Sequence, residues 1–317
     1  MQYLDFEKAI KDLDAKLSRL TNGEKALLDK NQLEVKRLTS KRHRLLMQAY
    51  SKLTPWQKTQ VARHEDRPHA LDYIETIFSD FELLCGDRLS AEDAAIVAGL
   101  AKLNGKTVMV MGNEKGHDID TRLKHNFGMA RPEGYRKAIR LMKLAEQYGI
   151  PVVTLVDTAG AFPGVEAEAH GQGQAIASCI ETSLDLKVPV VCCIIGEGGS
   201  GGALALAAGN AVIMLENSIY SVISPEGCAS ILWKDFKYAQ KATEILHLTA
   251  EDMLKLGVIE EIIAEPIGGA HRFPKETMQS VADALSKYLE KFSKMSATEL
   301  VDQRHQRFLL LKKTGQV

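Results

Sequence analysis

The sequence predicts an α/β fold built on a mostly parallel sheet, with helical segments at both ends of the 317-residue chain. Short apolar runs alternate with helical segments through the middle of the chain, which is typical of parallel strands joined by crossover helices. Two of these runs end in glycine-rich turns, the usual place for a ligand at the carboxyl end of a parallel strand. The expected strands are Thr107–Met111, Val152–Val156, Val190–Ile195 and Ala211–Leu215.

In chain order, the elements divide the sequence into three parts. Residues 1–55 are highly charged and carry leucines at helical spacing, which predicts an N-terminal helical extension. Residues 56–290 contain the α/β pattern, and residues 291–317 form a predicted C-terminal helical tail. We interpret the basic cluster Lys41–Arg44 as a solvated helix face. The helices expected in the middle part are Glu133–Tyr148, Glu166–Leu186, Gly201–Ala208 and Phe236–His247.

Composition excludes several classes of function. A net charge of -1 argues against a general nucleic-acid or anionic-membrane surface. The apolar runs are too short to span a bilayer, and the N-terminus does not resemble a signal peptide. The five cysteines form no C-x-x-C pair, which favours a reducing cytoplasm and argues against a zinc site. We therefore expect a cytoplasmic chain with no metal of its own.

The most informative motif is the glycine run Gly196–Gly202, which follows an expected strand and leads into an expected helix. The first N–H groups of a helix have no partner within it, and the helix dipole adds positive potential there. Glycine also lets a ligand approach the backbone without meeting a β-carbon. The run therefore predicts an anion or oxyanion site made of backbone amides.

Other interpretations of this run remain open. It lacks the lysine and hydroxyl spacing of a P-loop, so nucleotide hydrolysis is not expected. Gly198–Gly202 match G-x-S-x-G, so the alternative is a serine hydrolase with Ser200 as nucleophile. Close packing of a helix on the sheet is a third interpretation, whereas a partner-binding scaffold would leave the glycine turns unexplained. The residues available to complete a triad are Asp235 or Asp252, and His247 or His271.

A second polar turn, residues 157–164, follows another expected strand. Two turns at the carboxyl ends of parallel strands can converge on one pocket. Asp157 is either a base or a turn cap, while Glu166, Glu168 and His170 are expected to face solvent or an interface. No His, Cys and carboxylate cluster has metal-ligand spacing. A site with many amides and no clear base suggests an anion whose proton is handled by another molecule.

Several long motifs, in order along the whole chain, resemble those of the alpha subunits of bacterial acetyl-CoA carboxylase carboxyltransferase. The motifs are Leu4–Glu7, Arg67–Pro68, Leu71–Tyr73, Gly86–Arg88, Asn126–Met129, Pro132–Ala138, Gly196–Gly202, Tyr220–Gly227 and Glu265–His271. The second turn departs from the family pattern D-T-P-G-A-Y-P-G, with Ala159 and Phe162 in place of proline and tyrosine. Neither change removes an amide from the expected site.

The resemblance implies a crotonase-like (ClpP/crotonase) fold, a superhelix of strand–strand–helix units. It also implies an α2β2 heterotetramer with a homologous beta subunit that binds acetyl-CoA and carries a four-cysteine zinc ribbon. In the implied reaction, carboxybiotin on a biotin carboxyl carrier protein gives its carboxyl group to acetyl-CoA. The product is malonyl-CoA for fatty acid biosynthesis, and biotin carboxylase belongs to the wider complex.

By the same resemblance, the backbone amides of Gly201 and Gly202 form an oxyanion hole for the ureido oxygen of biotin. The released biotin nitrogen can take the proton, so no side-chain base is needed. Lys115, Arg122 and Lys124 could meet an acidic carrier or CoA phosphates, or simply form a solvated loop. The further substrate-binding residues implied are Gly160, Ala161, Gly198, Gly199 and Ala203.

Overall fold

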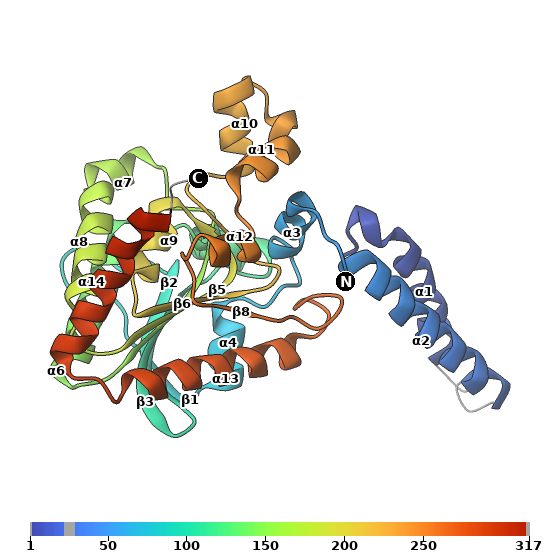
Figure 1. Cartoon of the computed structure of the whole chain (residues 1–317), viewed down its shortest axis with the longest axis horizontal. Helices are drawn as coiled ribbons and strands as arrows, with labels where there is room; N and C mark the ends of the chain where they lie inside the picture. Colours follow the sequence, from blue (N-terminus) through green and yellow to red (C-terminus); the bar gives the residue numbers. More distant parts are fainter. Residues whose placement is uncertain (1, 22–28, 315–317) are drawn as a thin grey trace.

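The centre of the structure is one eight-stranded sheet with helices packed on both faces (Figure 1). The computed structural model describes residues 2–21 and 29–314. Along the sheet the order is β1-β2-β3-β4-β5-β6-β8, and β7 pairs with the far end of β5. The pairs β1·β2 and β2·β3 are antiparallel, and the other pairs are parallel. The strands are β1 Ser79–Leu83, β2 Ile96–Leu103, β3 Lys106–Asn113, β4 Val152–Thr158, β5 Val190–Gly199, β6 Ala211–Leu215, β7 Ile219–Ser221 and β8 Glu261–Ile263.

Two apolar cores lie on opposite faces of this sheet. One core is completed by α6, α8 and α9, and the other by α4 and α13. The central strands are buried along their whole length, which explains their continuous apolar sequence. The helices of the domain are α3 Pro55–Ala62, α4 Ala70–Ile77, α5 Ile119–Lys124, η3 Asn126–Gly128, α6 Pro132–Gln147, α7 Val165–Ala169, α8 Gln172–Asp185, α9 Ser200–Ala207, α10 Pro225–Trp233, η4 Phe236–Tyr238, α11 Ala239–Leu246, α12 Ala250–Lys255, α13 Pro274–Phe292 and α14 Ala297–Thr314.

Local sequence explains where several helices begin. Thr54 caps α3 by accepting the N–H of Gln57, and Pro55 occupies the first helical position. Ser224 caps α10 in the same way, followed by Pro225. α3 contacts β5 and β7 at the glycine run, and an ion pair from Arg63 to Glu226 brings the first turn of α10 to the same place.

The four predicted strands are confirmed as β3 to β6, but the glycine run differs from expectation. β5 continues to Gly199, because Glu197, Gly198 and Gly199 pair with the short strand β7. The first half of the run is therefore strand, and the turn into α9 is abrupt. The helix expected over 166–186 is interrupted at Gly171, whose φ of +82° separates α7 from α8. The segment 236–247 begins as the 3-10 turn η4 before α11.

The buried cysteines behave as small apolar side chains, as expected for Cys192 and Cys193. Both lie inside β5 with no exposed surface. Burial raises the pKa of the Cys192 thiol to about 11, so it stays protonated at neutral pH. These thiols therefore contribute packing and not reactivity.

Two antiparallel helices, α1 Lys8–Thr21 and α2 Asp29–Tyr50, project from the domain as an arm (Figure 1). The short helix η1 Asp5–Glu7 leads into α1, and Glu7 at its end fixes the base of the arm. Its carboxylate accepts hydrogen bonds from Tyr50 at 2.9 Å and from Arg272 at 2.8 Å. Within the basic cluster 41–44, Arg42 departs from the predicted solvated face, because it pairs with Asp14 of α1 at 3.4 Å. The other members of that cluster are exposed.

The last helix, α14, is held against the domain by Arg304, whose side chain is fully buried. The guanidinium group donates to four backbone carbonyls and one side-chain amide oxygen, at 2.6–3.0 Å. Burial lowers the pKa of Arg304 to about 10, so the group remains charged at neutral pH. The acceptors are the carbonyls of Ser183, Leu184, Leu186 and Val188, and Oδ1 of Asn210.

Replacing this guanidinium should therefore be strongly destabilising. We predict that Arg304→Met lowers the free energy of unfolding by about 3 kcal/mol or more, because several buried acceptors lose their donors at once. His305→Ala on the same helix removes only an exposed contact to Asp185 and should change stability by less than about 0.5 kcal/mol. Urea unfolding of both variants checks this, and equal losses would show that Arg304 does not anchor α14.

Candidate functional site

The two glycine-containing turns meet at the carboxyl ends of β4 and β5, as predicted. A β-carbon on Gly199 would lie 2.1 Å from the carbonyl oxygen of Ala159. A β-carbon on Gly202 would lie 2.5 Å from the nitrogen of Ala161 and 2.6 Å from the carbonyl carbon of Gly160. Such distances are impossible for real side chains, so Gly199 and Gly202 are required by the contact itself. The close-packing interpretation is thus correct for these two glycines.

Asp157 connects the turns and does not have the freedom of a base. It is buried at the end of β4, and its Oδ1 accepts the backbone N–H of Glu197 at 2.8 Å. The same oxygen lies 2.7 Å from the ammonium nitrogen of Lys115. A β-carbon on Gly196 would stand 2.4 Å from this oxygen, which explains a third glycine of the run. Asp157 therefore ties β5 to β4 and to the loop that carries Lys115.

Gly201 has no such structural reason to be glycine. Its φ is not positive, and a β-carbon there would make an ordinary 3.5 Å contact with Ile176. The positive φ in this turn falls instead on Ser200, at +51°. Gly201 is half-buried and lines an open hollow, so the space beside this residue is available to a ligand.

The start of α9 supplies the unpaired amides. No side chain caps this helix at Gly199, so helix geometry leaves the N–H groups of Ser200, Gly201 and Gly202 without helical partners. The helix dipole adds positive potential at the same end.

An apolar hollow of about 470 Å³ opens beside these amides. Ser200 and Gly201 form part of its lining, and most of the remainder is aliphatic or aromatic. Apolar walls around a few directed polar groups are typical of small-molecule sites. The apolar lining consists of Leu204, Tyr220, Val222, Leu246, Met253 and Val258.

A second, polar hollow of about 380 Å³ is lined by Asp157, Ala159 and Glu197 from the two turns. Glu197 lies 2.9 Å from Lys115 and 2.6 Å from Arg63. Burial alone would raise the pKa of Glu197, but these two cations hold it down to about 2. Glu197 is therefore ionised at neutral pH and fixed in place.

The three cations of the charged loop before Asn126 have different environments in the structure. Lys115 is largely buried and paired with two carboxylates, so it supports the turns and is not a free cation for a carrier protein. Arg122 lines the polar hollow and donates to the carbonyl of Gly116 at 3.3 Å, while Lys124 is exposed. Glu166, Glu168 and His170 are exposed as expected, the last 3.0 Å from Glu133.

The residues of a serine hydrolase triad are not assembled. Ser200 is exposed at an abrupt strand-to-helix turn, which suits a nucleophile. Among the described residues, however, no hydrogen bond joins Ser200 to a histidine. His247 is mostly exposed and faces Asp252 at 3.8 Å, and His271 lies at the base of the arm. The hydrolase alternative therefore lacks its base.

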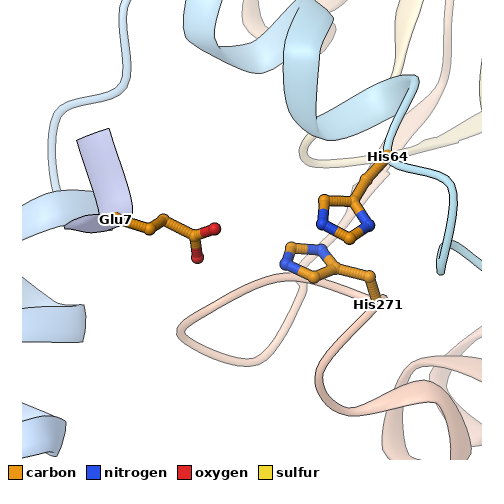
Figure 2. Close-up of side chains that lie close together, drawn as sticks. All are labelled: Glu7, His64 and His271. Atoms are coloured by element: carbon orange, nitrogen blue, oxygen red, sulfur yellow. The ribbon is translucent and has the colours of Figure 1, made fainter. Parts of the chain in front are cut away.

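Two clusters within the described ranges bring together metal-ligating side chains. The buried one comprises Glu7, His64 and His271 (Figure 2). The two rings stack with centroids 3.9 Å apart and planes 16° from parallel, so one ion cannot lie in both ring planes, where the nitrogen lone pairs point. The Glu7 carboxylate is already neutralised by Arg272 at 2.8 Å. His64 accepts the N–H of Asp66 at Nδ1, so its Nε2–H donates to a backbone carbonyl and no lone pair is free.

The second cluster is His69, Asp72 and His117. Its two imidazole rings are also stacked, 4.4 Å apart and 15° from parallel, which gives the same poor geometry for a shared ion. Asp72 already accepts the backbone N–H of His69 at 2.7 Å and faces His117 at 3.0 Å. We assign a metal ion to neither cluster.

Sequence reasoning missed two residues that shape the site. Arg63 joins Glu197 of β5 to Glu226 of α10, with nitrogen–oxygen distances of 2.6 and 2.7 Å. Tyr220 lies under Gly198 and lines the apolar hollow. The three-residue strand β7 that carries Tyr220 is too short to show periodicity, and a lone arginine at the end of α3 gives no local signal.

The sequence comparisons decide the family. Residues 3–312 match the family model described as acetyl co-enzyme A carboxylase carboxyltransferase-like. Proteins named acetyl-coenzyme A carboxylase carboxyl transferase subunit alpha are 54% identical to this chain. They come from Paramagnetospirillum magneticum, over 99% of both chains, and from Agrobacterium fabrum, over 97% of both.

This chain belongs to that family. It is thus an alpha subunit of the acetyl-CoA carboxylase carboxyltransferase and a biotin-dependent carboxyltransferase enzyme. The resemblance seen in the motifs is confirmed, and the hydrolase alternative is not favoured.

Solved structures show the fold. Transcarboxylase 12S matches with a TM-score of 0.56 at 20% identity, covering 70% of this chain and 42% of that chain. A Pseudomonas malonate decarboxylase hetero-tetramer matches with a TM-score of 0.56 at 15% identity, covering 71% and 93%. The alpha subunit therefore has the predicted crotonase-like fold. Among its described helices, none combines the length and apolar character needed to cross a membrane.

The buried histidine at the arm's base gives a test of pH dependence. Burial, together with His64 and two nearby guanidinium groups, lowers the pKa of His271 to about 2. The unfolded chain takes up this proton near pH 6.5, so the stabilisation is complete above that pH and is lost as the pH falls towards 2. We predict that, between pH 7.5 and 5.5, the wild type loses about 1.4 kcal/mol more than His271→Phe. Urea unfolding measures the difference, and parallel pH profiles would contradict it.

Proposed function

We propose that this alpha subunit holds the biotin side of the carboxyl transfer, with the amides of Gly201 and Gly202 as the oxyanion hole. The observation that carries the proposal is the free space over Gly201, at a glycine that the fold itself does not require. The ureido oxygen would accept from these two amides, and the apolar hollow would surround the ring. Preorganised amides in a shielded site stabilise developing charge without reorganisation.

The reaction balances without a side-chain base. The bond between the carboxyl carbon and the ureido nitrogen breaks, and a carbon–carbon bond forms at the acetyl methyl group of acetyl-CoA. The ureido nitrogen keeps the electron pair and takes the methyl proton, which leaves biotin and malonyl-CoA. The residues of this chain fit that balance, since Asp157 is held by Lys115 and a backbone amide and Glu197 by the same lysine, so neither carboxylate lies unpartnered at the turns.

The other residues of the turns support this arrangement in the proposal. Gly160 and Ala161 pack under Gly202, and Gly198 and Gly199 belong to β5 and set the abrupt turn. Ala203 is buried behind the amides. We propose that residues 56–290 carry the transfer, while 1–55 and 291–317 act as supporting extensions.

The proposal requires a partner. A carboxyltransferase beta subunit would bind acetyl-CoA and carry the zinc ribbon, giving α2β2, and a biotin carboxyl carrier protein would deliver the donor. Biotin carboxylase would belong to the same cytoplasmic complex and supply carboxybiotin for fatty acid biosynthesis. In transcarboxylase 12S the similar fold covers only 42% of the chain, which supports the idea that this fold works beside a second unit.

The first test is reconstitution. We expect the isolated alpha subunit to form little malonyl-CoA and to gain activity when the beta subunit is added, because one amide turn serves only one of the two reactants. Malonyl-CoA formation from carboxybiotin measures this. Full activity of the partner-free chain would contradict the assignment of biotin to this subunit and of acetyl-CoA to the beta subunit.

The second test addresses Gly201 directly. Gly201→Val adds a branched side chain next to the proposed donor amide, 3.5 Å from Ile176 and without a backbone clash, so we expect a normal fold and a loss of roughly 10²- to 10³-fold in kcat, the loss typical of one oxyanion donor. Gly173→Val is the matched control, because Gly173 also lies in the first turn of a helix with open space around it. Normal turnover of a folded Gly201→Val complex would remove this amide from the site.

A third test separates the two enzyme classes at Ser200. Ser200→Ala should keep most of the carboxyltransferase activity, since the proposed transfer gives the hydroxyl no role. A fluorophosphonate probe should not label the wild type, because the hydroxyl has no base. Stoichiometric labelling that disappears in Ser200→Ala would favour the hydrolase instead.

A further inference from the structure

Arg63, at the end of α3, contacts two carboxylates from different parts of the fold. Its Nε donates to Glu197 of β5 at 2.6 Å. Its two terminal nitrogens donate to the two carboxylate oxygens of Glu226 in α10, at 2.7 and 3.3 Å. A guanidinium group in this two-pronged geometry holds a carboxylate in one orientation, which the single ammonium group of lysine does not do. Arg63 therefore sets the position of the first turn of α10 relative to β5.

This contact attaches α10 to the domain. α10 packs on η4 and α11, and its Cys228 and Ala229 are buried with Ala242 of α11 in a small separate core. Among the hydrogen bonds and ion pairs between described residues, only the contact from Arg63 to Glu226 joins α10 to a helix or strand outside this group. α11 also packs on α3. Helix packing thus holds the group on the domain, and the ion pair fixes where α10 begins.

The chain between β7 and α10 borders the apolar hollow. Only residues 222–224, which we call the wall segment, separate these two elements. Val222 of this segment is 80% exposed and lines the hollow together with Gly201. At one end of the segment, Tyr220 of β7 pairs with Gly198 of β5. The guanidinium contact holds the other end, so a segment of three residues is anchored on both sides.

We propose that Arg63 is a positioning residue for the ring of biotin, because it holds the wall segment at a set distance from the amide of Gly201. The inference rests on the proposed function. Arg63 belongs to the lining of the polar hollow and not to that of the apolar hollow, so it acts on the ring through Glu226 and the wall segment. Loss of the contact frees this side of the hollow and weakens the binding of biotin, whereas the binding of the acyl-CoA is unchanged.

A purely structural role for Arg63 gives a different expectation. The side chains of Arg63 and Glu226 are 29% and 39% exposed, and ion pairs at such exposure contribute little to stability. A positioning role therefore changes the Michaelis constant of biotin more than the melting temperature. A purely structural role lowers the melting temperature and leaves that constant unchanged.

The first measurement is the Michaelis constant of biotin for the complex with the beta subunit. Transfer from malonyl-CoA to free biotin, the reverse of the reaction above, gives kcat and the KM of each reactant. For Glu226→Ala we expect a roughly 10-fold rise in the KM of biotin, with kcat and the KM of malonyl-CoA changed by less than about 2-fold. Arg63→Met should raise the KM of biotin at least as much. The double variant should be no worse than Arg63→Met, because the two residues act as one unit.

The matched control is Arg272→Met. Arg272 likewise bridges two carboxylates, those of Glu7 and Asp14, at 2.8 and 3.3 Å, but it does so at the base of the arm. Its loss removes a comparable pair of contacts without touching the wall segment. We therefore expect the KM of biotin to remain at the wild-type value in this variant.

The second measurement does not depend on catalysis. Amide hydrogen exchange in the free alpha subunit reports local opening of the wall segment and of the first turn of α10. Exchange there should be faster in Arg63→Met and in Glu226→Ala than in the wild type, and unchanged in the Arg272→Met control.

Three results would overturn the inference. They are a wild-type KM of biotin in both Arg63→Met and Glu226→Ala, an equal rise of that constant in the control, and unchanged amide exchange in the two variants. If the wild-type complex transfers no carboxyl group to biotin, the proposed function fails. Amide exchange then decides the role of Arg63 by itself, since faster exchange in the two variants supports its positioning of the wall segment and unchanged exchange contradicts it.

Discussion

The candidate site depends on the close approach of two backbone turns, which is possible only because glycine stands at three points of contact. Gly199 lies against the carbonyl of Ala159, and Gly202 lies against the amide of Ala161. Asp157 fixes the same junction by accepting the N–H of Glu197 at 2.8 Å, in the space that the absent side chain of Gly196 leaves free. Without this contact, α9 would not begin beside the hollow that Ser200 and Gly201 line.

Buried ion pairs also hold the two turns together. Lys115 neutralises both Asp157 and Glu197, and Arg63 adds a second cation to Glu197. Removing one partner from such a network leaves an uncompensated buried charge, which is more damaging than the loss of a surface pair. The site therefore combines a rigid, fully paired polar side with an open apolar side. Fixed amides next to an apolar hollow suit a site that must meet charge without reorganising.

Sequence patterns predicted the parts of the fold that have long or strongly apolar elements. The strands β3 to β6 and the helices α6 and α9 were expected, because buried parallel strands and amphipathic helices leave clear signals. The three-residue strands β7 and β8 were not expected, since such short segments show no periodicity. The continuation of β5 through Gly199 was missed because glycine disfavours strands, and only pairing with β7 keeps it extended. The convergence of the turns was predicted, whereas the Arg63 link depends on residues far apart in sequence.

The central proposal is that the amides of Gly201 and Gly202 donate hydrogen bonds to the ureido oxygen of biotin. The most direct measurement is the amide NMR signal of glycine-labelled alpha subunit, assembled with the beta subunit, as biotin is added. The account predicts downfield shifts of the Gly201 and Gly202 amide protons, with Gly173 unchanged. Saturable binding of biotin that shifts other glycines and leaves these two unmoved would contradict it.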